Sequence, residues 1–312
     1  MLDQTKAVLR DFTAGSPTEQ TVIWTNLTRQ EIADRLAQRG TSVCVHVVEE
    51  LLAELGYHRR QAQKAQSMGQ HADRNAQFET IARLKQQYLD STDPILSIDT
   101  KKRELIGNFH RRGTLFTRET IRTFDHDFPS FAEGVAIPHG IYDLKLNRGY
   151  VHLGTSHDTS EFACACLADW WRRFGRKLYP QAQSLLLLCD GGGSNSASTY
   201  LFKADLQQWV NRLGWAVRVA HYPPYASKYN PIEHRLFGQL SRACRGVIFH
   251  SVDLVRELMA KTRTKTGLRV VVDIVDKVYQ KGRKVAEDVK NSLHVVRDDF
   301  LPQWNYRVLP NI

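Results

Sequence analysis

The sequence has none of the long apolar runs that mark a membrane protein. No stretch approaches the roughly 18 uninterrupted apolar residues of a spanning helix. The N-terminus also lacks the basic segment followed by an apolar segment that characterises a secretory signal. These absences predict a cytoplasmic protein with no membrane partner.

Cysteine is scarce, and the spacing of the cysteines argues against disulfides or a zinc site. There are five cysteines, the number is odd, and no two of them form a C-x-x-C pair. Most lie in apolar surroundings, so buried free thiols are the preferred interpretation over a zinc site or disulfides. The five residues are Cys44, Cys164, Cys166, Cys189 and Cys244.

Negative charge is the scarcer sign. The chain carries 43 Lys and Arg against 33 Asp and Glu, which gives a net charge of +10 and a pI near 9.4. This excess favours a polyanionic partner, nucleic acid first, over a merely basic soluble protein. The length of 312 residues suffices for one large domain or two smaller ones.

The N-terminal part has the pattern of two short helices. Residues 11–18 suggest a loop in a short lead-in, and Thr28 followed by Glu31 fits a capping box that opens the first helix. Gly40 ends it, and apolar spacing predicts a second helix over 43–55. The pair predicts a helix-turn-helix, with an ordinary helical hairpin as the alternative.

In a helix-turn-helix, the start of the second helix reads bases and nearby basic residues contact phosphates. The candidates at the helix start are Ser42 and His46, and those in the basic segment after it are Arg59 and Arg60. We therefore expect a DNA-binding domain over 1–60, a linker and connecting helix over 61–92, and a larger domain over 93–312.

Two short apolar runs end in aspartate. Residues 185–189 precede Asp190 and a glycine cluster, and residues 95–98 precede Asp99. Both runs suggest buried strands, and reacting groups collect at the carboxyl ends of strands in open sheets. Two converging carboxylates need a cation or a proton between them, although Asp190 alone would also suit a turn or a helix N-cap.

The other elements of the larger domain alternate in type. We expect a strand over 104–109 that pairs with 95–99, a hairpin of 132–143 with 149–154, helices over 157–174 and 197–213, and a strand over 214–222. Residues 270–272 and 295–296 suit either a strand or a buried helix. The pattern predicts a mixed α/β layer fold preceded by a small all-α domain.

A third carboxylate opens the helix that follows the last of these strands. Pro231 suits the first turn of a helix, and Glu233 lies within that turn. Two aspartates at strand ends and a glutamate on a later helix match a site for phosphoryl transfer with two divalent ions. The alternative for Glu233 alone is a residue that complements the helix dipole.

These residues and the segments around them resemble the DDE transposases, in particular the ISAzo group of bacterial insertion-sequence transposases, which are related to the mariner type. The matching segments are SIDTKK (97–102), ELIGNF (104–109), AIPHGIYDL (136–144), HDTSEFA (157–163), DGGGSN (190–195), HYPP (221–224), NPIEHRLF (230–237), TKTGL (264–268) and WNY (304–306).

The resemblance implies an RNase H-like catalytic core that cleaves and joins DNA strands with Mg²⁺ or Mn²⁺, as two ions. Asp99, Asp190 and Glu233 would be the metal ligands, with Asn195 and His234 beside the site. Terminal inverted repeats and target DNA would be the partners of a homo-oligomer on paired ends, at the bacterial nucleoid. Further candidate DNA contacts are Lys101, Lys102, Lys228 and Lys265.

Two other functions remain compatible with this sequence. One is a catalytically inactive or truncated DNA-binding protein derived from a transposase. The other is a nuclease on the same core that cuts DNA without joining it.

Overall fold

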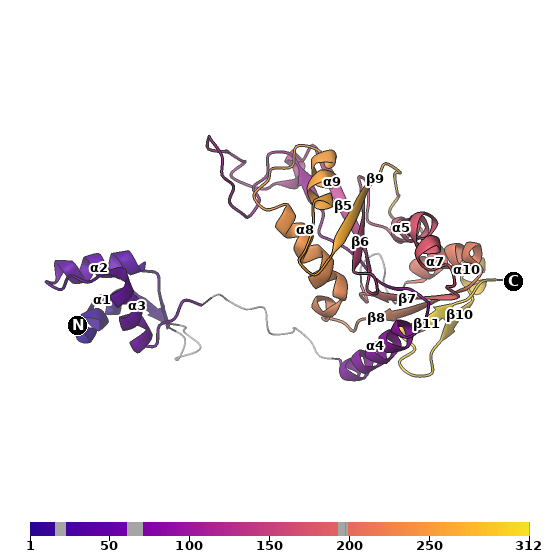
Figure 1. The fold of residues 1–312 in the computed structure, drawn as a ribbon, viewed down its shortest axis with the longest axis horizontal. Coiled ribbons are helices and arrows are strands. Elements are labelled where there is room, and N and C mark those ends of the chain that lie inside the picture. Colours follow the sequence, from indigo (N-terminus) through magenta and orange to yellow (C-terminus); the bar gives the residue numbers. More distant parts are fainter. Residues whose placement is uncertain (16–22, 61–70, 193–196, 198, 312) are drawn as a thin grey trace. The chain divides into compact units, whose positions relative to one another are not determined.

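The computed structural model describes residues 1–15, 23–60, 71–192, 197 and 199–311. The chain divides into two compact units, Met1–Gln66 and Ser67–Ile312 (Figure 1). Asn195 and residues 61–70 of the expected linker lie outside the described residues. No described helix has the length and apolar character needed to cross a bilayer.

The first unit is a small helical body. Its elements are α1 (Leu2–Arg10), β1 (Thr13–Gly15), β2 (Ile23–Thr25), α2 (Arg29–Gln38) and α3 (Val45–Glu54). The core joins Val8 of α1, Ile32 and Leu36 of α2, and Val48 of α3. The three helices therefore share one apolar centre.

The capping box at the start of α2 is confirmed, since the Thr28 side chain accepts from the Glu31 amide and Glu31 accepts from the Thr28 amide at 2.7 Å. At the other end, Gly40 adopts a left-handed backbone with φ of +87°. The chain then turns back, and the Thr41 amide donates to the Leu36 carbonyl at 2.9 Å.

The loop predicted over 11–18 is wrong at Thr13–Gly15, which form strand β1 and pair antiparallel with β2. Residues 16–18 lie outside the described residues, and the helix α1 precedes the predicted loop. Val8 and Leu9 are the buried apolar residues of α1, too few for a clear periodicity. Helix α1 is stabilised by packing against α2 and α3, and the apolar pattern of its own sequence is too weak to predict it.

The second unit is built on one large mixed sheet. Its strands are β3 (Ile95–Thr100), β4 (Glu104–Ile106), β5 (Gly134–Asp143), β6 (Arg148–Gly154), β7 (Ser184–Cys189), β8 (Ala216–His221), β9 (Arg269–Val275), β10 (Val295–Arg297) and β11 (Asn305–Val308). Within the described residues the order is β10-β11-β8-β7-β3-β5-β6-β9.

The centre of this sheet has the RNase H-like arrangement. Strands β3, β7 and β8 are parallel neighbours, while β5 runs antiparallel to both β3 and β6. In the order β6-β5-β3-β7-β8, the strands β6, β5 and β3 form an antiparallel meander. Strands β7 and β8 follow in parallel to β3. The expected mixed α/β fold is confirmed, whereas the first unit is not all-α, because it also contains the two-stranded sheet of β1 and β2.

Helices cover both faces of the sheet (Figure 1). They are α4 (Arg74–Leu89), α5 (Ser160–Trp170), α6 (Arg176–Leu178), α7 (Tyr200–Leu213), α8 (Gly238–Ala243), α9 (Val252–Ala260) and α10 (Glu287–Asn291), with single turns η1 (Pro129–Phe131), η2 (Trp171–Gly175), η4 (Ser227–Tyr229) and η5 (Glu233–Phe237).

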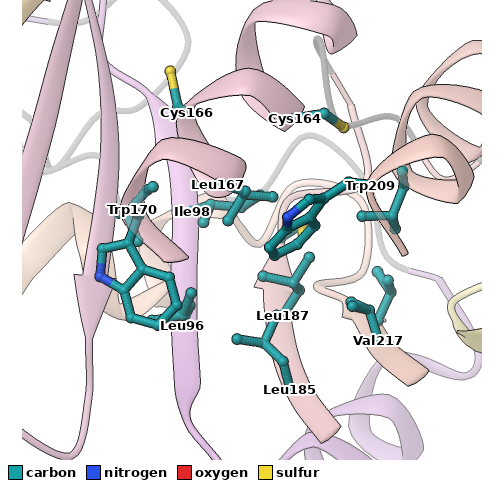
Figure 2. Close-up of a cluster of buried hydrophobic side chains, with 14 of the residues drawn as sticks. Leu96, Ile98, Cys164, Cys166, Leu167, Trp170, Leu185, Leu187, Trp209 and Val217 are labelled. Atoms are coloured by element: carbon teal, nitrogen blue, oxygen red, sulfur yellow. The ribbon is translucent and has the colours of Figure 1, made fainter. Parts of the chain in front are cut away.

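The largest apolar cluster lies where α5 and α7 pack on the sheet. Figure 2 shows Leu96 of β3 beside Trp170 of α5, and Leu187 of β7 below Trp209 of α7. A second cluster packs η5, α8 and α9 on β5, β6 and β9. A third includes α4 and the opposite faces of β3 and β7.

One predicted pairing was wrong. Strand β4 pairs with β5, with Glu104 opposite Ala136, and not with β3. The reason is that both edges of β3 are occupied, one by β5 and the other by β7. The segments that periodicity left undecided are strands, β9 and β10.

The cysteine interpretation holds for four of the five residues. All five are free thiols, and Cys164, Cys166, Cys189 and Cys244 are buried, whereas Cys44 is exposed.

Candidate active site

The two aspartates leave the sheet at the same edge. Parallel strands β3 and β7 are in register with Ile98 opposite Cys189, so Asp99 and Asp190 come next on each strand. Each carboxylate is only partly exposed. The apolar runs that predict the strands therefore also bring these two side chains together.

Glu233 reaches this edge because its helical turn packs closely on the sheet. Ile232 and Phe237, on either side of it in sequence, are buried against β5 and β6. Gly140 of β5 makes this approach possible, since a β-carbon there would lie 2.5 Å from Phe237 and 2.9 Å from Ile232. Gly149 of β6 gives the same clearance to Leu236.

The three carboxylates interact electrostatically. Burial, and then the charge of Asp190, raises the pKa of Asp99 to about 8, with smaller contributions from Glu233 and Asp158. Burial also raises the pKa of Asp190 to about 6, and Glu233 adds to this. Like charges at a half-buried edge disfavour ionisation of both aspartates.

Asp190 is held at two points. The Asn230 amide donates to its Oδ1 at 3.2 Å. Its backbone carbonyl lies 2.9 Å from Nδ1 of the fully buried His221, which must donate because a carbonyl only accepts. The other ring nitrogen of His221 then accepts from the Tyr306 hydroxyl at 3.1 Å. Burial lowers the pKa of His221 to about 4, so this ring is neutral.

A second neutral histidine lies beside Asp99. The Thr100 amide donates to Asp99 Oδ1 at 2.7 Å, and the Thr100 hydroxyl donates to Asp158 at 3.0 Å. That hydroxyl must therefore accept from His139 Nδ1, also 3.0 Å away. Burial lowers the pKa of His139 to about 3. The sequence patterns predict no role for His139, His221 or Asp158.

The site suits a hard divalent cation by its chemistry. Among the residues that the structure describes, no group of three or more His, Cys, Asp or Glu side chains is arranged to hold a metal ion. The facing donors are nevertheless carboxylate oxygens, which Mg²⁺ and Mn²⁺ prefer. Burial raises the pKa of Asp99 and of Asp190, and the charge of Glu233 adds to both shifts, so a bound cation would favour the ionised forms.

The remaining predicted residues are spread over both units. In the first unit, Ser42, His46, Arg59 and Arg60 are exposed. In the second unit, exposed lysines are Lys102, Lys228 and Lys265. Lys101 is largely buried and ion-paired with Glu104, which also pairs with Arg111. His234 is exposed, and its Nε2 contacts the Lys228 carbonyl.

Several complexes of the Mos1 transposase are among the solved structures with a similar fold. The Mos1 paired-end complex with the left transposon end is 16% identical with a TM-score of 0.46, covering 82% of this chain and 69% of that one. The mariner Mos1 paired-end complex with Mg is 15% identical with a TM-score of 0.47 and the same coverage. The chain matches no curated protein.

A family model gives the membership of the chain. The model described as Rhodopirellula transposase DDE domain matches residues 4–310, which is nearly the whole sequence. The resemblance seen in the sequence is thereby confirmed. The protein belongs to this family of DDE transposases.

Proposed function

We propose that this protein cleaves DNA strands at the ends of an insertion sequence and joins them to target DNA. The observation that supports the proposal is that Asp99 and Asp190 follow paired positions of β3 and β7 and that the charge of Glu233 acts on both. Burial, and then the charges of Asp190 and Glu233, raise the pKa of Asp99, and a cation bound beside these carboxylates would offset both effects.

In this proposal Asp99, Asp190 and Glu233 hold two Mg²⁺ or Mn²⁺ ions. Such ions lower the pKa of an attacking oxygen and neutralise the charge that develops on the phosphate. The protein residues supply rigidity, because His221 fixes the Asp190 backbone and Thr100 fixes the Asp99 carboxylate. The neutral state of His221 and His139 keeps extra positive charge from competing with the cations.

DNA recognition is divided between the units. We assign 1–60 to a helix-turn-helix domain, in which His46 in the first turn of α3 and Ser42 just before the helix read bases. Arg59 and Arg60 contact phosphates after it. Residues 61–92 are the linker and connecting helix, and 93–312 form the catalytic domain. Exposed Lys102, Lys228 and Lys265 bind phosphates there, and the active form is a homo-oligomer on paired ends.

Strand cleavage on a labelled duplex that carries a terminal repeat tests the proposal. The wild-type protein should nick this duplex in Mg²⁺ or Mn²⁺, should yield joined products with target DNA, and should do neither in EDTA. Glu233→Gln keeps the shape of the side chain but removes its charge. This variant should lose cleavage and keep binding to the end duplex.

The outcomes separate the three functions. Nicking without joined products would identify a nuclease. End binding without nicking in any metal would identify an inactive DNA-binding protein. Full cleavage by Glu233→Gln would remove Glu233 from the site.

A further inference from the structure

We infer that Asn230 is a positioning residue that orients the Asp190 carboxylate and ties it to the segments that carry Asp99 and Glu233. The inference rests on the proposed metal site, because it concerns the geometry of the three carboxylates. Asn230 follows the turn η4 and precedes Pro231 and the Glu233 turn, so the sequence alone suggests only a turn residue.

The contacts of Asn230 reach all three segments. Its Nδ2 donates to Asp190 Oδ1 at 3.2 Å and lies 3.4 Å from the Ile98 carbonyl, one residue before Asp99. Its backbone carbonyl accepts from the Glu233 amide at 3.0 Å. One fully buried residue therefore touches Asp190 itself, the strand of Asp99 and the helical turn of Glu233.

Ser97 completes the arrangement from β3. Its hydroxyl donates to Asn230 Oδ1 and accepts from the Ile232 amide at 3.0 Å. Because Ser97 donates to the amide oxygen, the NH₂ group of Asn230 must face Asp190 and Ile98. Ser97 is itself fully buried, so no solvent competes for either partner.

The chemistry of the amide fits this position. A side chain here must accept from Ser97 and donate to Asp190 at the same time, which an amide does and an ionised carboxylate cannot. The hydrogen bond also favours the ionised form of Asp190, the form that binds a cation. Partners of metal-binding carboxylates act in this way, and their loss typically weakens metal affinity about 10–100-fold.

A structural role alone would give a different result, and a second buried asparagine provides the matched control. Asn305 is also fully buried, and its amide exchanges hydrogen bonds with Gln77 at 2.7 and 3.0 Å. It touches none of the three carboxylates through these bonds. Asn230→Ala and Asn305→Ala thus each remove one buried amide, the first bonded to Asp190 itself and the second separated from Asp190 by Gln77 and His221.

The test is Mn²⁺ binding to the full-length chain by titration calorimetry, together with urea unfolding in EDTA. Both alanine variants should lose stability in EDTA. Only Asn230→Ala should weaken Mn²⁺ binding, by about 10-fold or more. Ser97→Ala keeps Asn230 but removes the hydrogen bond from the Ser97 hydroxyl to the Asn230 amide oxygen. It should weaken Mn²⁺ binding by a smaller factor, and it replaces Asn230→Ala in the test if that variant does not fold.

The results separate this inference from the function on which it rests. Suppose that the wild-type chain binds Mn²⁺ and that Asn230→Ala and Ser97→Ala bind it with the same affinity. This result would overturn the inference but not the proposed metal site. The same would hold if Asn305→Ala weakened binding as much as Asn230→Ala. A wild-type chain that binds no Mn²⁺ would overturn the proposed metal site and the inference together.

Discussion

At Asp99 the proposed function conflicts with folding. Burial and the neighbouring charge of Asp190 raise its pKa from 3.8 to about 8, so the folded state opposes its ionisation. A raised carboxyl pKa means that stability falls as the pH rises from near 4 to near 8, because the unfolded chain ionises freely. If Asp99 binds a cation as proposed, the same residue destabilises the fold when no cation is bound.

We therefore predict that Asp99→Asn raises the free energy of unfolding in EDTA. The gain in the free energy of unfolding should be near zero at pH 4 and on the order of 1–3 kcal/mol at pH 8. The reason is that aspartate ionises freely only in the unfolded chain, whereas asparagine does not ionise in either state. Mg²⁺ should stabilise the wild-type protein and have little effect on the variant. Urea unfolding at both pH values checks this, with the exposed Asp253→Asn as control. A destabilised variant at pH 8 would contradict the prediction.

Among the elements, the contact of η5 with β5 sets the position of Glu233. We predict that Gly140→Ala costs about 1–3 kcal/mol of stability, because the added carbon meets buried Phe237 and Ile232 in a packed core. The displaced turn should also lower metal-dependent cleavage. The measurement is urea unfolding together with the cleavage rate.

Gly238 is the matched control for that substitution. It opens α8, and a β-carbon there would lie 3.5 Å from the Glu233 carbonyl, an ordinary contact. Gly238→Ala should therefore be neutral or stabilising by up to about 1 kcal/mol, since alanine favours helix. Equal losses of cleavage in both variants would mean that Gly140 does not set the position of Glu233.

Edge strand β9 is tied to helix α5 by an ionic network. Asp169 of α5 accepts from His152 at 3.2 Å and from Arg173 at 3.1 Å, and Arg173 also pairs with Asp273 of β9 at 2.6 Å. The hydrogen bond from His152, then those from Arg172 and Arg173, hold the pKa of Asp169 well below its usual range.

A lowered carboxyl pKa contributes stability above the ordinary value near 4 and loses it as the pH falls below that value. We predict that Asp169→Asn costs about 1–3 kcal/mol at pH 7 and progressively less below pH 4. Unfolding free energies of both proteins between pH 3 and pH 7 measure this difference. A cost that does not change with pH would assign the loss to packing instead of charge.

The elements also show what a sequence can predict. Strands β3 and β7 are predictable because each is a short apolar run that ends in aspartate, and their parallel pairing follows from the fold class. The partner of β4 is not, because it depends on which edges of β3 are already occupied. Asn230 looks like a turn residue because its partners Ser97 and Asp190 are distant in sequence.

At the scale of the whole molecule, the net charge of +10 and the two units suggest two kinds of DNA contact. Phosphate contacts release counterions, so they set the salt dependence of binding, whereas base contacts set sequence preference. The later part of α3 carries the exposed acids Glu49, Glu50 and Glu54. Base reading is therefore expected from His46 in the first turn of that helix and from Ser42 just before it.

These two contacts should separate in a titration of binding against salt. Lys265→Ala should weaken binding to the end duplex and to unrelated DNA alike, and should lower the slope of log affinity against log salt by about 1. His46→Ala should leave that slope unchanged and cost about 1–3 kcal/mol of preference for the end sequence. If His46→Ala lowered the slope without changing the preference, His46 would contact phosphate, and the base-reading role of α3 would have to be abandoned.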